Sequence, residues 1–388
     1  MASAKHRSRV TRSLSAFLMA VLMAGCCCLF AEKRAQPLVI YLEPFGIPRA
    51  LFGRGGPLLC LHMHASGTRL FWLDDTHLFV AFTTNPPCTF HTSPEPSNLR
   101  GLVFDTTTGV RVASHDWTVS EDLSVFAGPN HTVVLRDGNK IEFLNARLQQ
   151  VDSGELDDTP KGLWPTPRRQ TMALLSSDGR NYEFYGARPM RLLDTISLDA
   201  SDEVRAIKEW VAGDERIAGS RCTDKSPYSC MKIVVQTPDS KFLERDGAPW
   251  SYQETEKPVS LQPIGFLDAT HLIISREDKN FFHGPEMLIV TPTGARIQLP
   301  PLGQLYPRRI AGIADEGERF GIEMYALGSC TDCIVANFFA VADPDSRKFL
   351  FEKRGTPYMS AGELSPDGRW MAILDEGAVT MYPLPPAR

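Results

Sequence analysis

The chain has 388 residues, 41 Lys and Arg against 46 Asp and Glu, a formal net charge of −5 and 43% hydrophobic residues. A nucleic-acid-binding protein needs a concentrated basic face, so this charge balance argues against nucleic acid as a partner. The length is about twice that of an ordinary domain, which predicts either two domains or one large repeat fold.

Residues 1–36 have the composition of a targeting or anchoring segment. Four lysine or arginine residues and no acidic residue occur among the first twelve, and an apolar run follows at residues 14–31. This order predicts a secretory signal peptide or an N-terminal membrane anchor, close to the lower length limit for spanning a bilayer. In either case we expect residues 37–388 to lie outside the cytoplasm, in the periplasm or at the cell surface.

The apolar run contains a sequence that resembles a bacterial lipobox, Leu22–Cys26. Ala24 and Gly25 fit that pattern, whereas Met23 stands where leucine is usual. Three outcomes stay open: lipidation at Cys26, retention as an uncleaved membrane anchor, and ordinary cleavage after Ala31. The first two attach the protein to a membrane through this segment.

From residue 37 onward, β-strand patterns alternate with turn sequences. The clearest unit is Pro263–Leu299, in which four short apolar segments are separated by turns such as Asp268–Thr270 and Thr291–Gly294. Strand-length runs bounded by Gly, Pro, Asp and Thr predict antiparallel hairpins. Helical periodicity is scarce, and its best candidate, Glu203–Trp210, fits an inner strand equally well.

The four-stranded unit recurs seven times along the chain. The first and fifth units share the pattern LDxTHL, at Leu73–Leu78 and Leu267–Leu272, in the turn between their first two strands. The corresponding turns of the other units are expected at Gly128–Asn130, Pro167–Arg169, Gly213–Glu215, Asp315–Gly317 and Ser365–Gly368. The six steps from Asp75 to Asp367 average about 49 residues, a spacing typical of propeller blades.

We therefore predict an all-β fold for residues 37–388, a single seven-bladed β-propeller of four-stranded antiparallel blades. Radial repetition protects the strand edges that an open sheet would expose. The seventh unit supplies only three strands, at Met359–Leu364, Arg369–Leu374 and Val379–Pro383. We expect Leu38–Leu42 to add the missing strand and close the ring, with Pro57–Met63 as the alternative.

One turn carries a family resemblance. Leu364–Trp370 reads LSPDGRW, and Ser176–Arg180 repeats part of it as SSDGR. The first string is similar to the SPDG turn of the WD40-like repeats in TolB-type and related bacterial β-propellers. The resemblance implies the propeller fold and carries no particular activity with it.

Cysteine spacing predicts disulfide bonds. Beyond the first 36 residues the cysteines are Cys60, Cys88, Cys222, Cys230, Cys330 and Cys333. An even number outside the cytoplasm favours pairing. The similar strings GSRCTD and GSCTD place two pairs, Cys222–Cys230 and Cys330–Cys333, in hairpins that join second and third strands. Cys60–Cys88 then remains by elimination.

The spacing of Cys330 and Cys333 is also that of redox and zinc motifs. A redox CxxC uses a helix N-terminus to lower the first thiol's pKa, and a zinc site needs a second pair of ligands nearby. A β-hairpin supplies neither, so a structural disulfide is favoured.

Histidines occur in two patterns. Cys60, His62 and His64 alternate along one expected strand and share a face, but no carboxylate accompanies them, so a structural role is favoured over a metal site. His77 and His271 occupy equal places in two units. We expect each to hydrogen-bond the neighbouring aspartate and stiffen its turn rather than act in catalysis.

The sequence contains no GxSxG, HExxH, P-loop or GxGxxG motif, and we predict no catalytic, cofactor-binding or metal residues. Side chains expected at the inner strands are dissimilar between units: Ser124, Trp164, Lys208, Gln262, Arg309 and Glu363. This favours a monomeric, non-catalytic binding or scaffold module that holds a protein or polysaccharide on one propeller face. The alternative is a propeller enzyme, a lactonase-like or glycan-lyase-like hydrolase with its site in the central channel.

Overall fold

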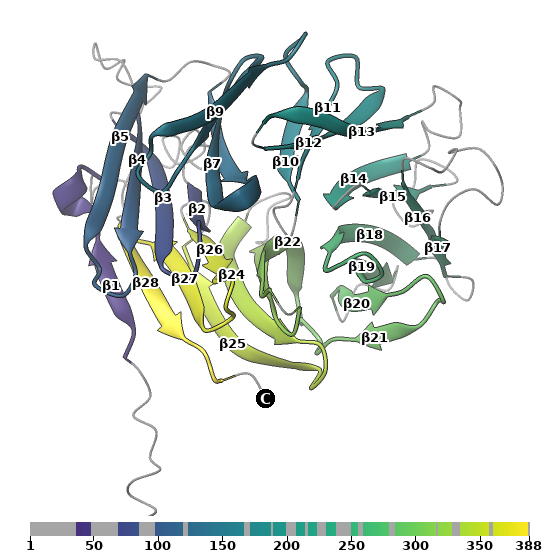
Figure 1. Ribbon diagram of the computed structural model, residues 1–388. Coiled ribbons are helices and arrows are strands. Elements are labelled where there is room, and N and C mark those ends of the chain that lie inside the picture. Colours follow the sequence, from purple (N-terminus) through teal and green to yellow (C-terminus); the bar gives the residue numbers. More distant parts are fainter. Residues whose placement is uncertain are drawn as a thin grey trace, which may run out of the picture. The chain divides into compact units, whose positions relative to one another are not determined.

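The computed structural model describes residues 36–47, 69–84, 98–118, 123–166, 171–187, 189–198, 207–213, 216–222, 230–237, 250–254, 259–278, 284–315, 317–327, 334–356 and 360–386 (Figure 1). Two compact units divide the chain, Met1–Pro37 and Leu38–Arg388. The strands belong to the second unit, and they form seven four-stranded antiparallel sheets.

The first four sheets each use four consecutive strands. Blade 1 comprises β2 (Arg69–Trp72), β3 (His77–Thr84), β4 (Asn98–Asp105) and β5 (Arg111–Thr118). Blade 2 comprises β6 (Ser124–Gly128), β7 (Thr132–Asp137), β8 (Lys140–Leu144) and β9 (Gln150–Glu155), with the short 3-10 helix η3 (Pro129–His131) after β6. Blade 3 comprises β10 (Gly162–Pro165), β11 (Met172–Leu175), β12 (Asn181–Gly186) and β13 (Arg191–Ser197). Blade 4 comprises β14 (Ile207–Gly213), β15 (Arg216–Arg221), β16 (Lys232–Gln236) and β17 (Trp250–Gln253).

The last blade differs from the others in its strand order. Blade 5 comprises β18 (Val259–Phe266), β19 (Leu272–Asp278), β20 (Glu286–Val290) and β21 (Arg296–Gln298). Blade 6 comprises β22 (Leu305–Ile313), β23 (Phe320–Leu327), β24 (Ile334–Asp343) and β25 (Lys348–Gly355). Blade 7 joins β26 (Ala361–Leu364), β27 (Trp370–Asp375) and β28 (Ala378–Pro383) to β1 (Leu38–Tyr41), which the 3-10 helix η1 (Glu43–Phe45) follows.

The apolar side chains pack between blades rather than on one side of a single sheet. Within the described residues, seven hydrophobic clusters occur, and each joins one pair of neighbouring blades, including blades 7 and 1. Leu78, Phe79, Val80 and Ala81 of β3 are all fully buried, because both faces of the strand are covered. Such strands read as continuous apolar runs rather than as alternating patterns. The predicted seven-bladed β-propeller is confirmed.

The two ends of the ring carry different connections. At the lower end, as we name it, the first strand of each blade turns into the second. At the upper end the second strand turns into the third, and the chain passes from one blade to the next. The first strand of each blade is the innermost, and β22 contacts the first strands of both neighbouring blades, β18 and β26 (Figure 1). Of residues 203–210, ambiguous in sequence, 207–210 lie in such an inner strand, β14, and 203–206 lie outside the described residues.

Strand β1 closes the ring as the outermost strand of blade 7. It pairs antiparallel with β28, from Leu38 opposite Met381 to Tyr41 opposite Ala378. Figure 1 shows the purple β1 beside the yellow β28. Ile40 and Leu42 are buried in the cluster between blades 7 and 1. The prediction for Leu38–Leu42 is thus confirmed, and the alternative segment 57–63 lies outside the described residues.

The LDxTHL turns at the lower end have the expected aspartate–histidine contacts. Asp74 accepts hydrogen bonds from the backbone N–H groups of Thr76 and His77, both at 2.8 Å, and its Oδ2 lies 2.9 Å from the His77 ring Nδ1. Asp268 makes the matching contacts, with Oδ2 2.8 Å from Nδ1 of His271. The two repeats are therefore identical turns that the aspartate organises from within.

The SPDG string also forms a turn that its own side chains hold together. The Ser365 hydroxyl donates to Asp367 at 2.6 Å and accepts the Trp370 N–H at 2.9 Å. Ser176 makes the same pair of bonds, to Asp178 and from Asn181. The two turns lie at opposite ends of the ring, because one joins β26 to β27 and the other joins β11 to β12.

Replacing Ile40 tests closure of the ring. We expect Ile40→Ala to lower the free energy of unfolding by about 2 to 5 kcal/mol, because a buried side chain is removed from the junction of blades 7 and 1. Its neighbour Val39, which is 39% exposed, is the matched control, and Val39→Ala should cost about 0.5 kcal/mol or less. Equal and small effects of the two variants in urea-unfolding curves would show that β1 does not hold the ring closed.

A second prediction concerns the pH dependence of the LDxTHL turns. Burial works against ionisation of Asp74 and Asp268, but hydrogen bonds from the neighbouring threonine and histidine outweigh it and hold both pKa values below the ordinary range. Carboxylates of this kind stabilise the fold above the unfolded-state pKa of about 4 and lose that contribution as the pH falls through the lower folded-state pKa.

The double variant Asp74→Asn, Asp268→Asn should therefore have a lower Tm than the parent at pH 7, and the difference should shrink at pH 3. Thermal unfolding followed by circular dichroism at both pH values measures this. Asp157→Asn, which changes an exposed aspartate outside these turns, should leave Tm unchanged. A Tm difference of the same size at both pH values would contradict the assigned role of the charge.

Candidate binding site on the inner strands

Five charged side chains from three consecutive blades meet on and beside the inner strands. We call them the inner charged cluster: Arg69 of β2, Arg308 and Arg309 of β22, Glu323 of β23 and Glu363 of β26. They belong to blades 1, 6 and 7, the blades on both sides of the closing junction.

An irregularity in β22 brings its two arginines to one carboxylate. The pairing of β22 with β23 shifts register between Pro307 and Arg309, so Arg308 is the extra residue of a bulge. Successive side chains of a regular strand point to opposite faces, and a bulge changes that alternation. As a result Arg308 Nη1 lies 3.3 Å from Glu323 Oε1 and Arg309 Nε lies 2.8 Å from Glu323 Oε2.

Arg309 connects blade 6 to blade 7. Its Nη1 is 3.4 Å from Glu363 Oε2, and its Nη2 donates to the Gly362 carbonyl at 3.3 Å. The accessibility of the partners differs, since 43% of the Arg309 side chain is accessible against 6% for Glu323 and 8% for Glu363. The carboxylates are thus covered by protein, while the side chain of the arginine that they orient remains partly accessible.

The charges of the cluster act on the pKa values of two of its arginines. Burial lowers the pKa of Arg69, and the nearby positive charges of Arg309 and Arg308 add to that effect against the opposing charge of Glu323. Burial also works against the charged form of Arg309, but Glu323 and Glu363 outweigh it and raise its pKa. An anion bound beside Arg69 would offset the repulsion that this residue experiences from Arg309 and Arg308.

In blade 6, aromatic and apolar side chains lie between the inner charged cluster and the upper end of the ring. Tyr306 pairs with Tyr325 across β22 and β23, and their rings stack with centroids 5.6 Å apart. Beyond them, Leu327 and Val335 at the upper ends of β23 and β24 are 41% and 46% exposed. Charged, aromatic and apolar side chains thus follow one another along the end of a single blade.

The six residues expected on the inner strands all lie there: Ser124 in β6, Trp164 in β10, Lys208 in β14, Gln262 in β18, Arg309 in β22 and Glu363 in β26. The structure brings Arg309 and Glu363 together. Ser124 accepts a hydrogen bond from Arg136 at 3.2 Å within its own blade. For Trp164 and Lys208 the structure describes the backbone alone.

Sequence reasoning missed Arg69, Arg308 and Glu323. One signal was available for Glu323, a single carboxylate in the otherwise apolar run FGIEMY of β23. A charged residue in a buried strand needs a partner, and the Arg308-Arg309 pair of the preceding strand is the nearest source of one.

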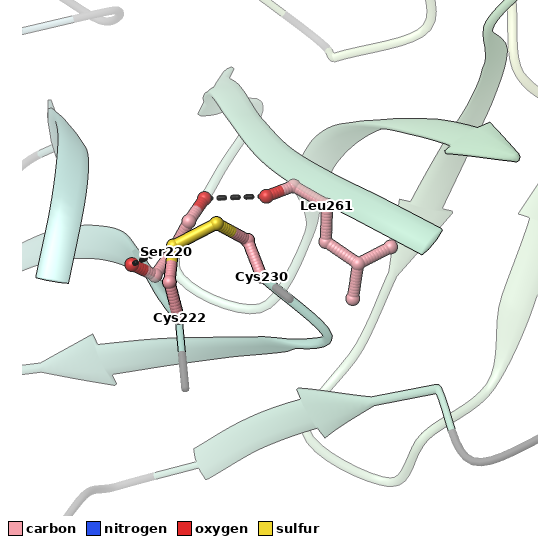
Figure 2. The surroundings of a disulfide bond; sticks show 4 residues. All are labelled: Ser220, Cys222, Cys230 and Leu261. Atoms are coloured by element: carbon pink, nitrogen blue, oxygen red, sulfur yellow. Dashed lines mark hydrogen bonds between the residues drawn. A yellow bond between two sulfur atoms is a disulfide. The ribbon is translucent and has the colours of Figure 1, made fainter. Parts of the chain in front are cut away.

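The disulfide Cys222–Cys230 is present at the upper end of blade 4, between β15 and β16 (Figure 2). Both cysteines are buried. Leu261 of the inner strand β18 is held from both sides: its carbonyl accepts the Ser220 hydroxyl, and its N–H donates to the Cys230 carbonyl at 2.8 Å. The bridged hairpin is therefore hydrogen-bonded to the next blade.

The other cysteine predictions lie outside the described residues, namely the pairs Cys330–Cys333 and Cys60–Cys88 and the lipidation site Cys26. The same holds for His62 and His64. Among the residues that the structure describes, no group of three or more His, Cys, Asp or Glu could hold a metal ion. Over the same residues, no helix has the length and apolar character needed to cross a membrane.

No protein-family model matches the chain, and no curated protein matches it. Several solved structures do match it. Hydrazine synthase of Kuenenia stuttgartiensis has 14% identity and a TM-score of 0.48 over 82% of this chain and 96% of that one. The Cps50 (Swd1) β-propeller domain of Myceliophteria thermophila has 9% identity and a TM-score of 0.47 over 83% and 96%. BamB of Moraxella catarrhalis has 9% identity and a TM-score of 0.37 over 81% and 84%.

Likeness at this level carries no inference about activity. The assignment of the chain to the seven-bladed β-propellers rests on its own sheet order and on the hydrophobic clusters between blades. The resemblance to TolB-type repeats stays a resemblance at the SPDG turn.

The buried disulfide gives a prediction for chemical labelling. In the folded, exported protein, Cys222 and Cys230 should not react with iodoacetamide, and reduction of their bond should require denaturant because both residues are buried. Cys222→Ser, Cys230→Ser should lower the free energy of unfolding by roughly 2 kcal/mol, since the bridge constrains the unfolded chain.

Peptide mass mapping under non-reducing conditions measures the link directly. Ser220→Ala serves as a comparison, because it removes the hydrogen bond to Leu261 while leaving the bridge in place. Carbamidomethylated Cys222 or Cys230 in protein labelled without reductant would contradict the assignment.

Proposed function

We propose that this protein is an exported or membrane-tethered, non-catalytic propeller that binds a protein or polysaccharide partner at one face of the ring. One observation carries the proposal: on and beside the inner strands of blades 6 and 7, buried glutamates hold two arginines whose side chains are partly accessible to solvent. Because the carboxylates are covered and hold the arginines in place, the arginine side chains are already positioned to contact a bound ligand.

The physical advantage of such an arrangement is rigidity. Arg309 is held by two glutamates and a backbone carbonyl from two blades, so little side-chain freedom remains to be lost when a ligand binds. The planar guanidinium offers several N–H donors in a fixed geometry that suits carboxylates and phosphates. Side chains placed on strands of a ring, rather than on loops, keep that geometry.

Two features support a place outside the cytoplasm. The basic start and apolar run of residues 14–31 have the order of an export signal or anchor. Disulfides such as Cys222–Cys230 persist in oxidising compartments. In this proposal residues 1–36 direct or tether the protein, and residues 37–388 form one propeller domain in the periplasm or at the cell surface.

The hydrolase alternative is less well supported by the same residues. General acid–base catalysis needs a carboxyl group free to exchange a proton with the substrate. Glu323 and Glu363, the two carboxylates of the inner charged cluster, are both engaged by Arg309 and almost fully covered. The arrangement favours holding a ligand over reacting with it.

Site-specific photocrosslinking in cells that export the full chain tests the proposal. A photoreactive phenylalanine analogue in place of Tyr306 of β22, which leaves Arg308 and Arg309 intact, should give a high-mass adduct. The same analogue at exposed Val112 of β5 should give none. Degradation of the adduct by protease or by periodate identifies its chemical class. Equal adducts from both positions, or none from position 306, would refute binding at the inner strands, and release of cleaved sugar products would favour the hydrolase.

A further inference from the structure

We propose that the upper end of blade 6 binds an acidic segment of a protein partner whose neighbouring side chains are apolar. This inference rests on the proposed function and narrows its partner class. The docking surface consists of Tyr306, Arg308 and Arg309 of β22 and of Leu327 and Val335 at the upper ends of the adjacent strands β23 and β24.

Strand pairing brings these residues to one place. Leu305 of β22 lies opposite Ala326 of β23, and Leu327 lies opposite Ile334 of β24. The upper ends of the three strands are therefore neighbours, at the spacing of roughly 5 Å between paired strands. Arg308 follows Tyr306 by two residues, so the charged and apolar parts of the surface adjoin.

Charge selects an acidic group. Arg308 is the more accessible arginine of the cluster, with 53% of its side chain accessible and a 3.3 Å contact to Glu323 through one guanidinium nitrogen. A guanidinium has five N–H donors, so this contact leaves capacity for a bidentate carboxylate. An acidic ligand is therefore the one whose charge complements the accessible side chain of Arg308.

The exposed apolar side chains of this surface favour a peptide over a polysaccharide as the ligand. Leu327 and Val335 are large apolar side chains left open on strands that elsewhere bury most of theirs. Exposed apolar residues beside a charged group are typical of protein-binding surfaces, whereas sugars offer hydroxyl groups that gain little from Leu and Val. The stacked rings of Tyr306 and Tyr325 lie between the arginines and the exposed apolar residues.

A selection from random dodecamer peptides displayed on phage, with the full-length protein as bait, tests the inference. The expected consensus is one or two Asp or Glu flanked by Leu, Ile, Val or Phe. Binding of the selected synthetic peptide, followed by fluorescence anisotropy, should weaken about tenfold or more in Arg308→Glu, because a charge-assisted hydrogen bond is replaced by repulsion.

Two variants make the test specific. Leu327→Ser should weaken binding of the same peptide severalfold, whereas Val112→Ser, an equally exposed position on the outer strand β5, should not change it. Peptides enriched in Lys or Arg, no enrichment at all, or affinity unchanged by Arg308→Glu would each overturn the inference. Unaltered Tm values of the variants show that any loss arises at the surface and not from unfolding.

A binding measurement with a polysaccharide distinguishes failure of this inference from failure of the proposed function. Polygalacturonate, which carries carboxylates without apolar side chains, should bind more weakly than the selected peptide. If it binds more tightly and depends on Arg308, the partner is a polysaccharide, the inference fails and the proposed function stands. If position 306 also gives no photocrosslinked adduct in cells, both fail.

Discussion

The backbone pairing of β1 with β28 is the interaction on which the rest of the structure depends. Each blade buries both faces between neighbours, so a ring with an unfinished last blade would expose a strand edge and an apolar face together. The chain supplies the missing strand from its own beginning, and Ile40 and Leu42 enter the core between blades 7 and 1. Closure therefore joins backbone hydrogen bonding to hydrophobic packing at a single junction.

Side chains secure the same junction from several directions. The Trp72 indole of blade 1 donates to the Glu363 carbonyl of blade 7 at 3.1 Å. On the other side of blade 7, buried Arg319 of blade 6 donates to the carbonyls of Gly368 and Pro385. Arg100 of β4 donates to the Phe45 carbonyl just after β1 and pairs with Asp116. The inner charged cluster spans the same three blades, so its geometry depends on the ring being closed.

The sequence predicted the architecture because turn chemistry repeats along it. The LDxTHL strings marked the same turn in two blades, and the unpaired run at Leu38–Leu42 marked the strand that closes the ring. Both are local signals. The binding site is not local: Arg309, Glu323 and Glu363 come from three strands in two blades, and the bulge at Arg308 that aims both arginines at Glu323 has no distinct sequence signature. The sequence predicted which residues lie on inner strands, but it did not predict which of their side chains would contact one another.

Hydrogen–deuterium exchange of the full-length protein tests the role of closure most directly. If β1 is an integral strand, peptides covering Leu38–Leu42 and Ala378–Pro383 will exchange slowly and together, in the same kinetic class as the inner strands β22 and β26. Fast exchange of Leu38–Leu42 while β28 and the inner strands stay protected would show that the ring holds without β1, and would contradict a closing role for this strand.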